Sequence, residues 1–86
     1  MDDLLGQLFI SLAGRDKGLI CTVVGIPEDD GYVLIADGRI RKVENPKKKK
    51  LKHLKPIDCE KLSSEKLTNR LIREAINEYK EDNGAM

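Results

Sequence analysis

The sequence predicts a mainly β domain of four to five short antiparallel strands followed by one C-terminal α-helix. Short apolar runs separated by Gly and Pro continue as far as Ile57, and after it the apolar period changes from two to about 3.6. The chain has 86 residues, which is enough for one small domain. Strands this short and this closely spaced are expected to close as a small barrel or a curled sheet.

The first strand is predicted near Leu8, and a glycine-bracketed loop is predicted to follow it. Residues 7–12 alternate, and we expect the more apolar face, Leu8, Ile10 and Leu12, to point inward, with Gln7, Phe9 and Ser11 opposite. Gly14 and Gly18 then enclose "RDK". A connection of this kind requires a positive φ at one or both glycines.

The next two strands are separated by a turn. "LICTVVGI" is β-branched and apolar on both faces, which favours a long central strand. "PEDDG" follows, in which Pro27 presets the start of a turn and Gly31 ends it. "YVLIA" is then predicted as the third strand.

Asp37 and Gly38 are predicted to form a two-residue hairpin turn into a strand at "RIRKV", residues 39–43. That strand would place Arg39 and Arg41 on one face. Pro46 is expected to end it, and the lysine run follows. "KHLKPI" is interpreted as a short closing strand, which Pro56 restricts to a sheet edge.

The C-terminal extension, residues 58–80, is predicted to contain a helix over about 68–80. Its apolar face would consist of Leu71, Ile72, Ala75, Ile76 and Tyr79, and its polar face of Arg70, Arg73, Asn77 and Lys80. Thr68 is the preferred N-cap and Ser63 the alternative. Residues 1–57 would form the barrel, and residues 81–86 a disordered tail.

Positive charge is concentrated in residues 39–56. The whole chain has a formal net charge of only +1, yet this segment has nine Lys and Arg beside one acid, Glu44. The near-neutral total therefore conceals a local positive field that would attract a polyanion. A solvated lysine run that only maintains solubility is the alternative.

The run "GQLFISLAGRDKGLICTVVGI" resembles a KOW motif, a strand, a basic glycine-bracketed loop and a second strand that open an SH3-like barrel. Together with "YVLIADGRIRKVENPKKKKLKHL", it resembles small bacterial KOW proteins related to the archaeal and eukaryotic large-subunit ribosomal proteins of the fourteen-e, six-e and twenty-seven-e group. The resemblance implies that Lys17 contacts RNA phosphate, with Arg15 in the same loop. Many KOW loops continue with another basic residue and Gly, whereas Leu19 follows directly here.

We therefore predict an RNA-binding protein that contacts structured RNA through phosphates. Only three aromatic residues are available for stacking bases. The resemblance implies ribosomal RNA of the large subunit as partner, with neighbouring ribosomal proteins beside it. The predicted RNA-binding residues are Arg15, Lys17, Arg39, Arg41, Lys42, Lys47, Lys48, Lys49, Lys50, Lys52, His53 and Lys55. The predicted structural loop residues are Gly14, Gly18, Asp37 and Gly38.

The lysine run, Lys47 to Lys50, has no compensating acids near it in sequence, so we expect a phosphate clamp that becomes ordered only on binding. For Arg39 and Arg41 the alternative is pairing with Asp29 or Asp30.

Other classes of function are disfavoured. The chain has no nucleophile with a base and no paired carboxylates, so no enzyme activity and no cofactor is expected. Cys21, Cys59, His53 and Asp58 match no metal-ligand spacing, and reduced thiols are expected. A cytoplasmic protein with no membrane segment, monomeric away from RNA, is predicted. A general nucleic-acid binder, a transcription-linked KOW module and an SH3-like protein-interaction module remain as alternatives. A ribosomal component and an assembly factor are not distinguished.

Overall fold

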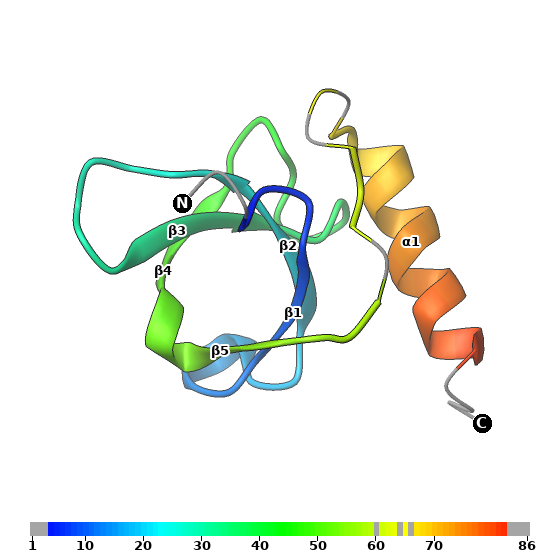
Figure 1. Ribbon diagram of the computed structural model, residues 1–86, viewed down its shortest axis with the longest axis horizontal. Coiled ribbons are helices and arrows are strands. Elements are labelled where there is room, and N and C mark those ends of the chain that lie inside the picture. Colours follow the sequence, from blue (N-terminus) through cyan, green and yellow to red (C-terminus); the bar gives the residue numbers. More distant parts are fainter. Residues whose placement is uncertain (1–3, 60, 64, 66, 83–86) are drawn as a thin grey trace.

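In the part of the chain that the structure describes, five antiparallel strands form one curled sheet, and one helix packs against its outer face (Figure 1). The computed structural model describes residues 4–59, 61–63, 65 and 67–82. The spatial order of the strands is β4-β3-β2-β1-β5. In chain order the elements are β1 (Leu8–Ser11), the 3-10 turn η2 (Gly14–Asp16), β2 (Ile20–Gly25), β3 (Tyr32–Ala36), β4 (Lys47–Lys50), the 3-10 turn η3 (Leu51–His53), β5 (Leu54–Pro56) and α1 (Asn69–Asp82).

The strands form a ring because the two edge strands of the sheet are consecutive in sequence. β4 and β5 lie at opposite ends of the strand order, and only the three residues of η3 separate them. Figure 1 shows the resulting circle of strands. The prediction of a mainly β, small SH3-like barrel with one C-terminal helix is confirmed. β5 at an edge, with Pro56 in it, is confirmed as well.

The barrel has an apolar cluster on each side of β1 and β2. The inner cluster fills the ring and contains Phe9, Cys21, Val23, Val33, Ile35 and Leu54. The outer cluster lies between the sheet and α1 and contains Leu8, Ala36, Ile57, Ile72 and Ile76. β2 is the middle strand of the five, so its two apolar faces serve the two clusters, as the sequence predicted.

The predicted orientation of the first strand was wrong. Phe9 points into the ring, Leu8 belongs to the cluster beneath the helix, and Leu12 is 49% exposed. Because α1 covers the outer face, β1 buries both of its faces. Alternation alone therefore does not identify the inward side of this strand.

The predicted hairpin at Asp37 and Gly38 was also wrong, since residues 39–43 form no strand. Both Asp37 and Gly38 donate their backbone N–H to the carbonyl of Arg41, at 2.8 and 3.0 Å. The Asp37 side chain closes the loop, because its Oδ1 accepts from the N–H of Arg39 at 3.0 Å and of Arg41 at 2.8 Å. Gly38 is buried against the first turn of the helix. The result is a wide loop, residues 37–46, instead of a tight turn.

The helix begins where predicted. The N–H of Leu71 donates to Oγ1 of Thr68 at 3.2 Å, which confirms Thr68 as the N-cap. Asn69 joins the helix to the 37–46 loop, since its Oδ1 accepts from the N–H of Val43 at 2.8 Å and its Nδ2 donates to Glu44 at 2.7 Å. The helix extends to Asp82, so the first two residues of the predicted disordered tail are helical. Residues 83–86 lie outside the described residues.

Replacing Gly38 with Ala should cost more stability than replacing Gly18 with Ala. Both glycines have a positive φ, which costs a non-glycine residue about 1–2 kcal/mol. A Cβ at Gly38 would in addition lie 2.5 Å from the Asn69 carbonyl oxygen, whereas a Cβ at Gly18 meets nothing within 4 Å. Urea unfolding of the two variants measures the difference. Equal losses of unfolding free energy would show that the helix does not hold the 37–46 loop.

Candidate nucleic-acid interface

The lysine run is an ordered strand, which corrects the expectation that it becomes ordered only on binding. Lys47 to Lys50 form β4 and pair with β3 in the register Ile35 with Lys47 through Tyr32 with Lys50. Pro46 thus precedes a strand instead of ending one. Because successive side chains of a strand point to opposite faces, the register divides the four lysines into two pairs.

Lys47 and Lys49 form the inward pair. They lie opposite Ile35 and Val33, two residues of the inner cluster. Lys49 is only 7% exposed, and its ammonium donates to the carbonyl of Ala13 at 2.8 Å. The same ammonium lies 3.7 Å from Oδ2 of Asp16, with which Lys47 also forms an ion pair. Acids far away in sequence therefore compensate part of the lysine run.

Asp16 lies among more positive charge than it neutralises. The hydrogen bond from Lys47 is the main cause that holds the pKa of this carboxyl below its ordinary value, and the charges of Lys47, Lys49 and Arg41 add to it. Nε of Arg41 is buried, and among the described residues it has no hydrogen-bond partner. Three cations thus act on one carboxylate, which leaves a positive excess at this end of the barrel.

The loop of residues 14–18 is positioned by these contacts. Gly14 and Gly18 have φ values of +77° and +89°, as the sequence predicted. The N–H of Gly18 donates to the Ser11 carbonyl at 2.8 Å, which closes the loop. Asp16 points back to β4, whereas Arg15 and Lys17 on either side of it are exposed. The fold therefore displays two loop cations next to the lysine strand.

Lys48 and Lys50 form the outward pair, on the face of the sheet that carries Tyr32 and Leu34. Lys48 pairs with Asp29, and its ammonium lies 4.9 Å from the centroid of the Tyr32 ring. Asp29 thus has a partner on β4. The alternative that Arg39 or Arg41 pairs with Asp29 or Asp30 has no support among the described ion pairs.

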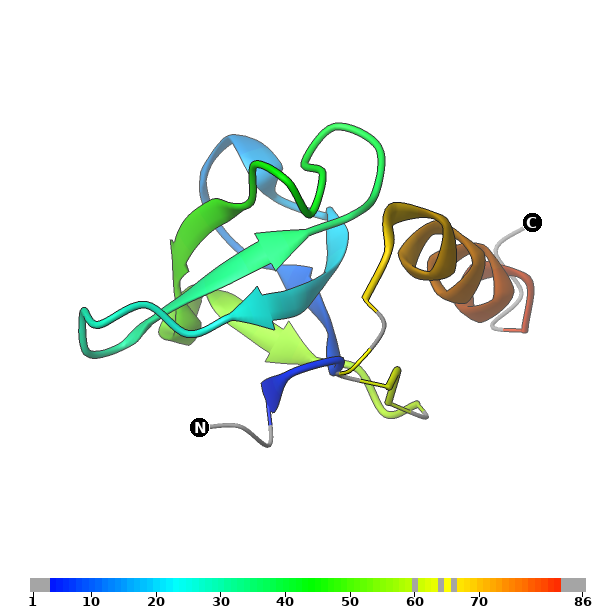
Figure 2. The ribbon, with the colours of Figure 1, turned by 90° about the horizontal axis from the view of Figure 1, so that it is seen from above.

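The 37–46 loop lies at the same end of the barrel as the 14–18 loop (Figure 2). Between these loops and the helix is a cavity of about 300 Å³ with three cationic side chains, Arg39, Arg73 and Lys80. Arg73 donates to the Gly38 carbonyl at 2.9 Å. Sequence reasoning placed Arg73 and Lys80 on the solvent face of the helix and so missed them. Arg73, Asn77 and Lys80 are at positions i, i+4 and i+7, and this spacing indicates that they share one face of the helix.

The remaining predicted cations extend around the barrel. Lys42 is exposed in the 37–46 loop, Lys52 and the half-buried His53 lie in η3, and Lys55 is exposed on β5. No described ion pair or side-chain hydrogen bond joins them to the group around Asp16.

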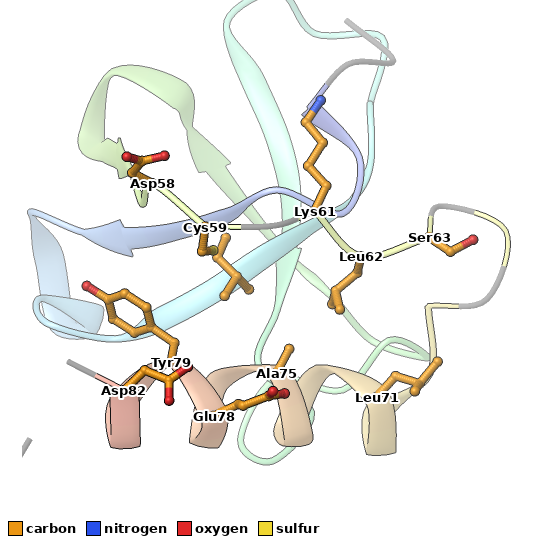
Figure 3. A pocket seen from close by; sticks show the side chains of 11 residues that line it. Asp58, Cys59, Lys61, Leu62, Ser63, Leu71, Ala75, Glu78, Tyr79 and Asp82 are labelled. Carbon is orange, nitrogen blue, oxygen red and sulfur yellow. The ribbon is translucent and has the colours of Figure 1, made fainter. Parts of the chain in front are cut away.

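A larger cavity of about 630 Å³ lies between α1 and residues 58–63 (Figure 3). Leu62 and Tyr79 point into it, whereas Lys61 points away from the helix. Asp58, Glu78 and Asp82 are among its lining residues, and this excess of carboxylates makes it a poor site for phosphate.

The two cysteines are free thiols. Cys21 is fully buried, and burial raises its pKa to about 12, while burial and then Asp58 raise the pKa of Cys59. Both are therefore protonated at neutral pH. Within the described part of the chain, no three His, Cys, Asp or Glu side chains gather as a metal site, and no helix is long and apolar enough to cross a bilayer.

Comparison with protein-family models and with curated protein sequences found no match to this chain.

The two lysine pairs should differ in their effect on stability. Replacing Lys47 and Lys49 with Ser should lower the free energy of unfolding by about 1–3 kcal/mol, because Asp16 and the Ala13 carbonyl lose their partners. Replacing Lys48 and Lys50 with Ser should change it by about 0.5 kcal/mol or less, since an exposed ion pair contributes little. Urea unfolding tests both pairs, which are matched in charge and strand. Equal effects would argue against the inward and outward division.

Asp16 should make stability sensitive to acid. Its folded pKa lies below the ordinary 3.8, so the carboxylate stabilises the fold at pH values above that figure. This contribution should decline as the pH falls below 3.8 and be lost below the folded pKa. The measurement is the free energy of unfolding between pH 7 and pH 2 for the wild type and Asp16→Asn. The variant should be less stable at pH 7, and its curve should converge on the wild type in acid. Parallel curves would contradict the role of Asp16.

Proposed function

We propose that the protein binds structured RNA through its phosphates, at the end of the barrel formed by the 14–18 loop, β4 and the 37–46 loop. The observation that supports this most directly is the group around Asp16, in which Lys47, Lys49 and Arg41 act on one carboxylate. The fold already holds these cationic side chains in place. They can therefore attract a polyanion without the entropy cost of ordering them on binding.

Three further features support a phosphate-binding surface. Arg15 and Lys17 are exposed on a loop that the inward lysines hold in place. Lys50 extends the charge along the outer face of β4. Arg39 extends it toward the helix, where Arg73 and Lys80 line the same cavity. Contacts of this kind are made to the backbone of nucleic acid and carry no sequence information by themselves.

RNA is favoured over duplex DNA by the resemblance of the 14–18 loop and its flanking strands to a KOW motif. The narrower proposal, an association with ribosomal RNA of the large subunit, rests on the same resemblance. A cytoplasmic location follows from it as part of this proposal.

Binding to a structured RNA, such as a hairpin from ribosomal RNA, should weaken steeply with salt. About six phosphate contacts correspond to a slope of log K against log salt of about −4 to −5. Replacing Arg15 and Lys17 with Gln should reduce that slope by about two and leave stability nearly unchanged, because both side chains are exposed. Fluorescence anisotropy at several salt concentrations measures both quantities.

The matched control replaces Lys61 and Arg70 with Gln. Both are exposed. Neither lines the cavity that contains Arg39, Arg73 and Lys80, and neither belongs to β4. The control should bind RNA almost as the wild type does. If the two double variants lose the same affinity, the attraction follows net charge alone and the proposed surface is wrong. A salt-independent affinity of the wild type would reject phosphate binding altogether.

A further inference from the structure

A third cavity lies at the other end of β4, away from the Asp16 group. It has a volume of about 480 Å³ and is lined by Asp30, Gly31, Tyr32, Lys50, Leu51 and Lys52. This volume is within the range of pockets that hold small organic groups, about 300–1,000 Å³. Tyr32, Leu51 and Lys52 lie outside the barrel end at which phosphate binding is proposed.

The backbone holds this cavity in shape. Tyr32 is directly opposite Lys50 in the β3–β4 register, so both side chains are on the outer face of the sheet. The N–H of Leu51 donates to the Gly31 carbonyl at 2.8 Å, which ties the start of η3 to the turn before β3. The backbone of Leu51 is therefore held beside the turn that precedes Tyr32, and an incoming group would meet a site that already exists.

The side chains combine an aromatic ring with cations and one carboxylate. Tyr32 is half-buried and, with Leu51, supplies an apolar wall. Lys50 and Lys52 are exposed in the same lining, whereas the ammonium of Lys48 lies over a face of the Tyr32 ring and does not line the cavity, so a base would stack on the ring face toward the cavity. Asp30 is an acceptor for an N–H group. A nucleotide needs these groups together, because its base stacks on a ring, its phosphates require cations, and its amino or imino group requires an acceptor.

The charge disfavours the peptide ligands that some small β-barrels bind. Recognition of methylated lysine uses a cage of several aromatic rings, whereas one ring lines this cavity. Three lysines surround that ring, and Asp29 and Asp30 offset only two of them. The field therefore repels a cationic peptide and attracts an anionic strand.

We propose that this cavity, the Tyr32 pocket, holds one unpaired nucleotide of the bound RNA, with its base stacked on Tyr32 and its phosphates next to Lys50 and Lys52. The inference rests on the proposed RNA binding and refines it. The target is then a folded RNA with an extruded base, not a continuous duplex. Lys50 belongs to both surfaces, so the strand β4 connects the phosphate-binding end of the barrel to the Tyr32 pocket.

The test compares two RNA hairpins of the same stem, one with a single bulged 2-aminopurine and one fully paired. The bulged hairpin should bind about tenfold more tightly, since stacking of one base on an aromatic side chain has about this value. Binding should also quench the 2-aminopurine fluorescence. Tyr32→Phe retains the ring and should keep both effects. Tyr32→Leu retains apolar bulk but removes the ring, and should lose both while its urea unfolding stays close to that of the wild type.

The possible outcomes distinguish a failure of this inference from a failure of the proposed RNA binding. If both hairpins bind with equal affinity and the same steep salt dependence, phosphate binding stands and the nucleotide pocket is wrong. If neither hairpin binds in a salt-dependent way, the proposed phosphate binding is itself wrong. Should Tyr32→Leu discriminate between the hairpins as the wild type does, the base stacks elsewhere and the inference is overturned. A proline-rich peptide that binds the wild type but not Tyr32→Leu, while the two hairpins bind both proteins alike, would make this a peptide site, which also overturns the inference.

Discussion

The arrangement of the barrel end depends on the contact of one carboxylate, Asp16, with two lysines of an edge strand. Asp16 belongs to the loop between β1 and β2, and Lys47 and Lys49 belong to β4, more than thirty residues later. Their attraction holds the loop against the mouth of the ring, so that Arg15 and Lys17 project from a fixed base. Burial of Lys49 is acceptable only because its ammonium has both this carboxylate and the Ala13 carbonyl as partners. Removing either partner leaves a charge in a poorly hydrated place.

The helix determines the second half of the architecture. Its residues Ile72 and Ile76 cover the outer face of β1 and β2, and its first residue, Asn69, holds the 37–46 loop by two hydrogen bonds. Sheet, loop and helix thus form one unit, with basic side chains of all three at the same end. This coupling also explains why Gly38 is surrounded on its helix side, whereas the exposed Gly18 has open space.

The sequence predicted those parts of the fold that depend on local chemistry. Glycine positions, the extent of β3, the edge position of Pro56 and the Thr68 cap all follow from requirements that a few neighbouring residues impose. What depends on distant partners was not predictable in this way. Phe9 could not be assigned to the ring without knowing that the helix covers Leu8, and the hairpin at Asp37 failed because Asn69 competes for the loop. For the candidate site, the concentration of positive charge identified the cationic residues. It did not predict that two lysines of β4 point inward and two point outward. The acids that pair with β4 come from other loops.

A strand made entirely of lysine also has a consequence for how the protein behaves among its own copies. β4 is an edge of the sheet, and an unprotected edge offers its backbone N–H and C=O groups to any other extended chain. Lys47 and Lys49 already have partners inside their own barrel, so a second β4 approaching this edge would bring the outward Lys48 and Lys50 of both chains together, and their like charges would oppose the pairing. The β4 edge therefore carries outward charges that oppose the addition of a like strand. At high concentration the barrel is protected from edge-to-edge aggregation by the same side chains that we propose for RNA.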